Sequence, residues 1–381
     1  MFHESYSNPN VKWILIAGIF SSITGSILWF STTWLIYGLG GSNEDLGRIL
    51  GTAGLLGVAV TLVASKIGDS YRKDIVIWFA GGFLILGSFI LAYSSTLTHV
   101  FIGQMVVVIG GSATFPVLAA LFADSIPGEH RNRIFGTQFL LQNLFNAVGN
   151  LFGYFIFRDL STTNIADLDT DLIRFTIFVA AISEIIAFAL ILRIRDRHSL
   201  SAEEEGTIAS QPAVVEEERV AGDQTKSSWF NPRDFAPGSL SILFLTLMAA
   251  FLIGFGAGIT IPFLPRFFFD VYEVDLADLS LIFALLTIIT AIWGKINANL
   301  ADKYGRVELI VINQMVSVTL LIVLSFYPPL AFAFLVLIIR NAVMNGVGPV
   351  NAAIQMEYTP RKYRSQINAL NTLAWAFLFS I

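Results

Sequence analysis

Residues 299–308 read NLADKYGRVE, and residues 66–75 read KIGDSYRKDI. Each segment is short and polar, and each separates two long apolar runs. Asp302 follows Asp69 by 233 positions, and Tyr304 follows Tyr71 by the same number. Two matching segments at one offset indicate that the chain contains an internal repeat.

The apolar runs around these segments identify a helical membrane protein. The 381 residues are 55% hydrophobic and 13% charged, with a mean hydropathy of +0.70, whereas a soluble domain carries about 25% charged residues. Apolar stretches of about 20 residues recur along the chain, and each is long enough to cross about 30 Å of hydrocarbon. A β-barrel would instead show alternating segments of about ten residues.

Eleven stretches are predicted to span the membrane. Their ranges are 13–37, 45–65, 74–94, 98–122, 133–157, 171–192, 239–265, 277–300, 307–326, 329–352 and 366–381. We therefore predict an N-terminal six-helix bundle at 1–192, a largely disordered linker at 193–238 and a C-terminal bundle at 239–381. The repeat predicts a twelfth helix, so we expect that this chain ends within the eleventh of twelve.

The basic residues predict the orientation of the helices. Fourteen Lys and Arg residues fall on the side that holds the N-terminus and the linker, and four fall on the other side. Because Lys and Arg are enriched in cytoplasmic loops, we expect the N-terminus and the linker in the cytoplasm and the protein in the cell membrane. The linker is rich in Glu and poor in aromatic residues, so it cannot bury enough apolar surface to fold. It is either a flexible tether or a regulatory binding segment.

The 233-residue offset extends well beyond the two polar segments. It relates Asp45 to Asp278, Leu46 to Leu279, Pro116 to Pro349, Val117 to Val350, Asp124 to Glu357, Pro127 to Pro360, Arg131 to Arg364 and Ile134 to Ile367. Because six helices separate the copies, both copies have the same orientation, which predicts a parallel repeat about an axis along the membrane normal.

This combination resembles the major facilitator superfamily of secondary transporters. The signature of that family lies between helices 2 and 3, with a weaker copy between helices 8 and 9, and reads approximately G-x-x-x-D-(R/K)-x-G-(R/K)-(R/K). The later copy here matches at Asp302, Lys303, Gly305 and Arg306, with Ala298 for the first Gly. The earlier copy matches at Asp69 and Lys73 and departs at Ser65, Ser70 and Arg72. The resemblance covers essentially the whole chain and implies an all-α polytopic fold of two six-helix bundles.

The resemblance and the residue types together predict a latch that closes the cytoplasmic side in the outward-facing state. A carboxylate can accept from the free N–H groups at a helix start, and a basic residue beside it can pair with an acid at the end of helix 4 or 10. The predicted latch residues are Asp69, Arg72, Lys73, Asp124, Arg131, Asp302, Lys303, Gly305, Arg306, Glu357 and Arg364. The alternative is that the basic residues only follow the usual cytoplasmic enrichment.

Polar residues inside the predicted helices are candidates for substrate binding, because they are costly in the bilayer. Amides recur every four residues along the fifth helix, and we expect this stripe to face protein or a wet cavity. The candidates are Arg340, Asn341, Asn345, Gln138, Gln142, Asn146, Trp29 and Lys295. The alternative for these side chains is hydrogen bonding between helices. Glu184, an acid within the sixth helix, is a candidate for proton coupling or a structural partner.

We therefore predict a secondary active transporter that moves a small polar or anionic organic solute by alternating access. The alternatives are an exporter of lipophilic compounds, a non-transporting receptor and a membrane enzyme. The four His residues lie at termini or loops without metal-ligand spacing, and no phosphate-binding glycine loop occurs, so we expect neither enzymatic activity nor a cofactor or metal. The expected partners are the bilayer, the solute and a coupling proton or sodium ion, with no nucleic acid, and we expect a monomer.

Overall fold

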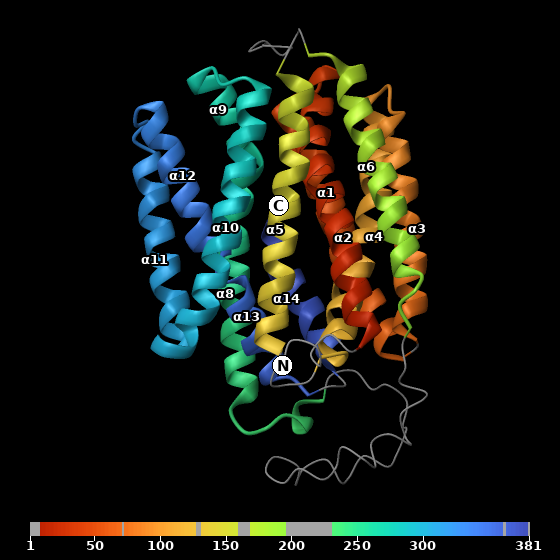
Figure 1. Ribbon diagram of the computed structural model, residues 1–381, viewed down its shortest axis with the longest axis vertical. Helices are drawn as coiled ribbons and strands as arrows, with labels where there is room; N and C mark the ends of the chain where they lie inside the picture. The colour runs from red at the N-terminus through yellow and green to blue at the C-terminus, as the bar shows by residue number, and fades with distance from the viewer. Residues whose placement is uncertain are drawn as a thin grey trace.

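The computed structural model describes residues 8–70, 72–126, 131–158, 168–195, 231–360 and 363–379. All regular elements in these ranges are helices that run side by side along one long axis (Figure 1). The N-terminal helix set comprises α1 (Pro9–Gly38), α2 (Asn43–Ser70), α3 (Lys73–Ala92), α4 (Leu97–Asp124), α5 (Arg131–Phe157) and α6 (Thr170–Ile191). The C-terminal helix set comprises η4 (Pro232–Asp234), α8 (Ser239–Thr260), η5 (Ile261–Phe263), α9 (Leu264–Tyr272), α10 (Leu276–Tyr304), α11 (Arg306–Leu324), α12 (Leu330–Asn345), α13 (Gly348–Glu357) and α14 (Arg364–Phe379).

The helices confirm an all-α membrane protein. Within the described ranges, nine helical segments are long and apolar enough to cross a membrane. The other two predicted spans are α5 and α14. The 27-residue α5 is long enough, but its amides lower its hydropathy, and α14 has 16 residues. All eleven predicted spans are therefore helical, while the twelve-helix architecture is only partly seen.

The internal repeat is reproduced in the helix boundaries. The starts of α2, α3, α4 and α5 are Asn43, Lys73, Leu97 and Arg131, and those of α10, α11, α12 and α14 are Leu276, Arg306, Leu330 and Arg364. Each start in the second list follows its counterpart by 233 positions. Equivalent apolar residues are buried in both copies, as with Leu46 and Leu279.

Two predicted helices of the C-terminal set are interrupted, a feature that the sequence analysis missed. The span predicted at 239–265 continues to Tyr272 and contains a 3-10 turn at Pro262, followed by α9 with Pro265 near its start. Proline cannot donate the backbone hydrogen bond of a helix interior and its ring crowds the preceding turn. The two prolines therefore explain why this span bends.

The second interruption separates α12 from α13 beside Pro349. Its repeat counterpart Pro116 lies inside an unbroken α4, so proline alone does not explain the break. The interrupted helix has Gly346 and Gly348, whereas α4 has Ala113 and Phe115 at the equivalent positions. Because glycine weakens a helix interior by about 1 kcal/mol relative to alanine, the two glycines allow the break that proline favours.

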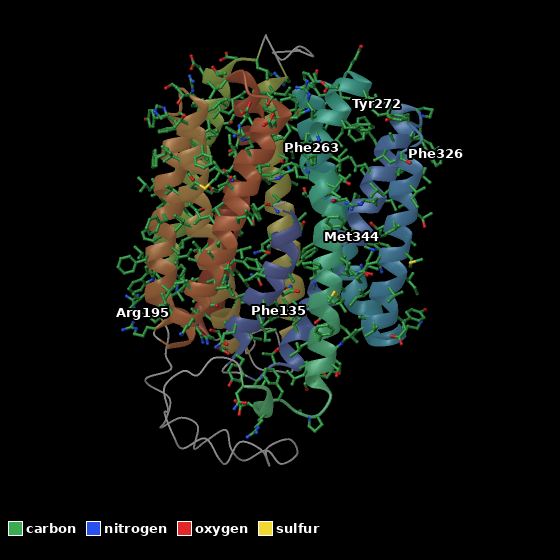
Figure 2. The ribbon with its side chains drawn as sticks, turned by 180° about the vertical axis from the view of Figure 1, so that it is seen from behind. Phe135, Arg195, Phe263, Tyr272, Phe326 and Met344 are labelled. Carbon is green, nitrogen blue, oxygen red and sulfur yellow. The ribbon has the colours of Figure 1, made fainter. Side chains whose placement is uncertain are left out.

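The bundle has two ends, and the end that carries the start of the linker is called the linker end. The linker end holds Arg195, which follows the end of α6, and the opposite end holds Tyr272 (Figure 2). Figure 2 also places Met344 of α12 about midway between the two ends. Arg340, one helical turn before Met344, therefore lies near the middle depth of the bundle.

The two helix sets contact each other through α5 and α14. Helix α5 packs on α1 of its own set and on α10 of the other, while α14 packs on α8 of its own set and on α2 of the other. At the linker end, α14 also touches α4, and α13 touches α5. One buried apolar cluster contains Trp34 and Phe157 of the N-terminal set together with Phe268 and Leu286 of the C-terminal set. This shared cluster joins the two sets, whereas the smaller buried clusters each lie within one set.

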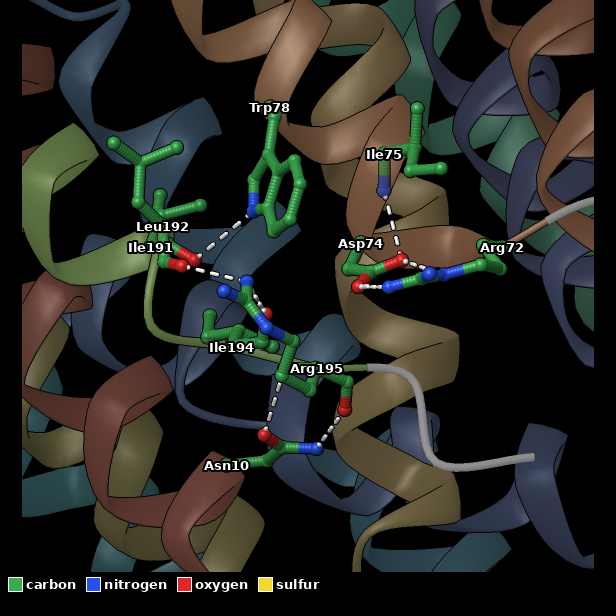
Figure 3. Close-up of polar contacts among 9 residues, drawn as sticks. All are labelled: Asn10, Arg72, Asp74, Ile75, Trp78, Ile191, Leu192, Ile194 and Arg195. Carbon is green, nitrogen blue, oxygen red and sulfur yellow. Dashed lines mark hydrogen bonds and ion pairs between the residues drawn. The ribbon is translucent and has the colours of Figure 1, made fainter. Parts of the chain in front are cut away.

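Polar contacts join α1 to α6 at several levels. Thr24 donates to the carbonyl of Ala180 at 3.0 Å. At the linker end, the side chain of Asn10 donates to the Arg195 carbonyl at 2.6 Å and accepts from the Arg195 N–H at 3.1 Å (Figure 3). The Arg195 guanidinium also lies 4.8 Å from the Trp78 ring of α3. The start of the linker is therefore anchored to both α1 and α3.

The predicted division at 1–192, 193–238 and 239–381 stays a prediction. Residues 196–230 of the predicted linker lie outside the described residues. The end of that linker, however, belongs to the fold, because η4 packs against the start of α14. Tyr363 donates to Asp234 at 2.6 Å, and its ring stacks on Phe235 at 5.5 Å.

Candidate functional site

Two ion pairs at the linker end join the residues that the repeat relates. Lys73 Nζ lies 2.8 Å from Asp124 Oδ2, and Arg306 pairs with Glu357. The residues of the second pair each follow those of the first by 233 positions. In both copies a basic residue at a helix start meets an acid at the end of a neighbouring helix. The contacts are those expected of the latch, and its gating role stays a prediction.

The remaining latch candidates are arranged differently. Arg72 pairs with Asp74 through two bonds of 2.6 and 3.1 Å (Figure 3). Lys303 lies 4.9 Å above the Tyr304 ring. Gly305 separates α10 from α11 with φ +94°, a conformation that glycine adopts at no steric cost. The side chains of Asp69, Arg131, Asp302 and Arg364, like Tyr71, lie outside the described residues.

Each of the two ion pairs lies within one helix set. Lys73–Asp124 joins α3 to α4, and Arg306–Glu357 joins α11 to α13. Contact between the sets at this end depends instead on close packing. The Phe139 ring of α5 fills the space beside Gly294 of α10 and Gly348 of α13, where a Cβ would meet it. At the linker end, the ion pairs therefore join helices within one set, while the Phe139 ring packs between the sets.

The amide stripe of α5 lies where the two helix sets meet. Gln138, Gln142 and Asn146 are half-buried and make no hydrogen bond to the described residues. The next turns on this helix touch both sets, because Gly149 packs against α1 and Gly153 against Ser280 of α10. Gln142 precedes Gly149 by seven residues, and Asn146 precedes Gly153 by seven residues. Seven residues are about two helical turns, so each amide lies on the same face of α5 as one of these glycines and two turns nearer the linker end. The stripe therefore follows the boundary between the sets and has free donors and acceptors there.

Arg340 is buried and lacks a partner. Its side chain belongs to α12, its residue is 8% exposed, and its Nε has no hydrogen bond. None of the described residues forms an ion pair with it. A buried guanidinium without an acceptor is costly, so this group is available for an anion or another acceptor.

The nearby asparagines of α12, unlike Arg340, form hydrogen bonds within the protein. Asn341 donates to Thr290 of α10 at 2.9 Å, and Asn345 donates to Asn341 at 2.8 Å. Asn341 therefore serves packing between α10 and α12, which is the alternative considered for it. Lys295 is exposed. Trp29 stands edge-on to Phe283 of α10, with 5.3 Å between ring centroids, and so connects the two sets.

A polar cluster between α10 and α11 was missed by the sequence analysis. Trp293 donates to Asn313 at 2.9 Å, and Asn313 donates to Asn297 at 3.2 Å. Asn297 is fully buried and its Nδ2 lacks a partner. Single asparagines on two helices show no periodic pattern, so only the packing reveals that they meet.

At the opposite end, aromatic and charged residues of α1 and α9 join the two sets. The Arg266 guanidinium lies 4.9 Å from the Tyr37 ring, and Asp270 holds Arg266 at 2.5 Å. The rings of Trp34 and Phe269 are 4.9 Å apart. Together with the packing at the linker end, this contact holds the sets together at both ends. The sequence signal for it was slight, namely a lone basic residue within an aromatic-rich segment.

Glu184 is buried between α6 and α1. Its residue is 2% exposed, and Ser21 donates to its carboxylate at 3.4 Å. Among the described residues it has no ion pair. The hydroxyls of Thr24 and Ser21 both face the carboxylate, but a carboxylate with hydroxyl neighbours alone is not held in place as a structural ion pair would be.

Comparisons with known proteins agree with this architecture. The family model described as Major Facilitator Superfamily matches residues 14–381. Among solved structures, a bacterial homolog of the human lysosomal transporter Spinster shows 16% identity over 98% of this chain and 82% of its own, with a TM-score of 0.68. The xylose transporter XylE from E. coli shows 13% identity over 97% and 90%, with a TM-score of 0.69.

The human organic anion transporter MFSD10 shows 13% identity over 97% of this chain and 91% of its own, with a TM-score of 0.66. At these identities the likeness establishes the fold. No curated protein sequence matches the chain.

Proposed function

Because the chain belongs to the Major Facilitator Superfamily and is an integral membrane transporter, we propose that it moves a small polar or anionic organic solute by alternating access between its two helix sets. The observation that carries this proposal is the buried, unpartnered guanidinium of Arg340 near the middle depth of the bundle. The half-buried amides of α5 add donors and acceptors where the two sets meet. The similar structures include transporters described as moving xylose and organic anions, which are solutes of these classes.

Uptake by the reconstituted protein tests the substrate class. The protein is placed in liposomes with an imposed pH gradient and supplied with a pool of organic anions, sugars and lipophilic cations. Arg340→Gln is expected to raise the KM for an anionic solute about tenfold or more, because a hydrogen bond to a charged group is worth about 1.5–3 kcal/mol. Arg340→Lys is expected to retain part of the affinity.

The matched control for Arg340 is Arg48→Gln, because Arg48 is exposed and pairs only weakly with Glu44 at 3.8 Å. Uptake of lipophilic cations alone, or an Arg340→Gln variant with unchanged KM, contradicts the polar-solute proposal and supports an exporter of lipophilic compounds. Absence of transport for every solute class supports a non-transporting receptor.

We also propose that Glu184 carries the coupling proton. The support is its burial and its lack of an ion pair among the described residues. Glu184→Gln is expected to abolish accumulation driven by the pH gradient while solute exchange at equal pH continues. Asp171→Asn on the same helix is the control, since Asp171 is exposed and pairs with Arg174. Unchanged accumulation in Glu184→Gln would assign Glu184 a structural role.

The linker end is proposed to face the cytoplasm of the cell membrane, on the basis of the excess of Lys and Arg there. The chain contains no Cys, so single cysteines report sidedness without background. Asn231→Cys is expected to react with an impermeant maleimide only after the cells are opened, and Glu44→Cys in intact cells. The reverse pattern contradicts the orientation. We propose a monomer, which the mass of the protein in detergent tests.

A further inference from the structure

We propose that a small cavity at the junction of α1, α5, α6 and α10 binds one sodium ion. The cavity has a volume of about 10 Å³, and half of the residues that line it have oxygen-bearing side chains: Ser26, Ser31, Asn150, Thr176 and Ser280. The others are apolar residues and glycines, Ile27, Phe30, Phe152, Gly149 and Gly153. About 10–15 Å³ is the space that one water-sized body occupies. The site is separate from Arg340 and from the linker-end ion pairs, and it does not depend on the substrate.

Three of the four hydroxyl groups of this cavity present oxygen lone pairs rather than protons. Ser26 donates to the Ile23 carbonyl at 3.0 Å. Thr176 donates to the Ile173 carbonyl at 2.7 Å, and its oxygen lies 2.8 Å from that of Ser31. Because the single proton of Thr176 is already used, Ser31 must be the donor in that pair. All three protons are thus engaged away from the cavity, which leaves a wall of acceptors that favours a cation.

Ser280 supplies an independent indication that the cavity holds a ligand. It is 1% exposed, and its Oγ has no hydrogen bond in the structure. Buried polar atoms are nearly always satisfied, so this oxygen requires a partner in the cavity. Asn150 is also buried and makes no hydrogen bond to the described residues. Its amide oxygen supplies a further possible ligand.

The ligand types select a monovalent ion. Hard cations prefer oxygen ligands, but Ca²⁺ and Mg²⁺ sites are built with carboxylates, and the residues that line this cavity include none. Glycines keep the space open on the α5 side. A Cβ at Gly149 would overlap Ser26 Oγ, and one at Gly153 would lie 3.0 Å from Ser280 Oγ.

A cation in this cavity would connect the two helix sets. Ser280 belongs to α10 of the C-terminal set, whereas the other four oxygen ligands belong to α1, α5 and α6 of the N-terminal set. The ion binds only where α5 is packed on α10, so by linkage it stabilises that packing. Sodium is therefore expected to favour the conformation in which the two sets are in contact.

Thermal unfolding of the purified protein tests this inference without a transport assay. Unfolding is followed by intrinsic Trp fluorescence in NaCl, KCl or choline chloride at constant ionic strength. The expected result is a saturable rise in Tm with Na⁺ that K⁺ and choline do not reproduce. Ser280→Ala is expected to raise the apparent Kd for Na⁺ about tenfold, because one ligand of a charged group is lost.

Two further variants distinguish sodium binding in this cavity from sodium binding elsewhere in the protein. Gly153→Ala fills the cavity without removing an oxygen and is expected to abolish the Na⁺ response. Thr287→Val on α10 is the control, because the Thr287 hydroxyl bonds its own backbone at Phe283 and Ala284 and does not line the cavity. Equal Tm values in all three salts overturn the proposal and leave water as the occupant. A full Na⁺ response in both Ser280→Ala and Gly153→Ala also overturns it, because the ion would then bind elsewhere.

Discussion

The two linker-end ion pairs occupy equivalent positions of the repeat but differ in burial. The side chains of Lys73 and Asp124 are 11% and 5% exposed, whereas those of Arg306 and Glu357 are 32% and 54% exposed. Removing the basic partner therefore tests the same contact in two environments. The perturbations are Lys73→Met and Arg306→Met.

The expected losses of stability differ severalfold. Lys73→Met leaves the Asp124 carboxylate buried without this partner, and breaking a buried pair in this way costs about 3 kcal/mol or more. The Glu357 carboxylate remains half in solvent after Arg306→Met, so that loss is expected to be about 1 kcal/mol or less. Replacing both buried partners by apolar residues, as in Lys73→Met with Asp124→Leu, is expected to recover most of the first loss, because no charge is then left buried.

The free energy of unfolding is measured by titration with SDS in mixed micelles, with Trp fluorescence as the signal. The double variant of Arg306 and Glu357 serves as the matched control, and it is expected to resemble its single variant. Equal losses for Lys73→Met and Arg306→Met would refute the argument from burial. Failure of the double variant of Lys73 and Asp124 to recover stability would show that the cost comes from something other than the burial of the Asp124 charge.

Three further changes test other contacts of the fold. Gly294→Ala brings a Cβ into overlap with the Phe139 ring, so it is expected to push α5 away from α10 and to lower uptake in liposomes. Adding Phe139→Leu to this variant is expected to restore uptake. Normal uptake by the Gly294→Ala variant would show that this packing is not needed. Gly305→Ala places a residue with a side chain at a backbone φ of +94°. The expected loss of stability is about 1–2 kcal/mol and is measured as a lower Tm. An unchanged Tm contradicts this expectation. Arg266→Ala removes the cation–π contact with Tyr37, worth about 0.5–2 kcal/mol, and is expected to lower the Tm; an unchanged Tm would show that this contact does not stabilise the fold.

The features that depend on local physics were predictable from the sequence. Transfer of apolar residues into hydrocarbon sets the length of a membrane helix, and the predicted spans agree with the helices to within a few residues in most cases. The repeat offset identified the equivalent helix starts and brought Lys73 with Asp124 and Arg306 with Glu357 into equivalent positions. A single sequence carries these signals because each depends on nearby residues or on one fixed separation.

Other features required the tertiary structure. The prolines at 116 and 349 occupy equivalent positions, yet only the second lies beside a helix break. Which face of α5 meets α10, and whether Asn341 or Arg340 finds a partner, depends on how helices distant in the sequence come together. The same holds for the contact between Tyr37 and Arg266.

The sequence by itself determined the class of protein, the membrane spans, the duplication and the equivalent positions of the charged residues at the linker end. Only the tertiary structure showed which buried polar groups of the described residues remain unsatisfied, and Arg340 Nε, Asn297 Nδ2 and Ser280 Oγ are among them. A residue type states which hydrogen bonds a side chain can make, but the bonds it does make are set by neighbours on other helices. The groups left without partners, which are the ones available to a solute or an ion, are therefore a property of the packed helices.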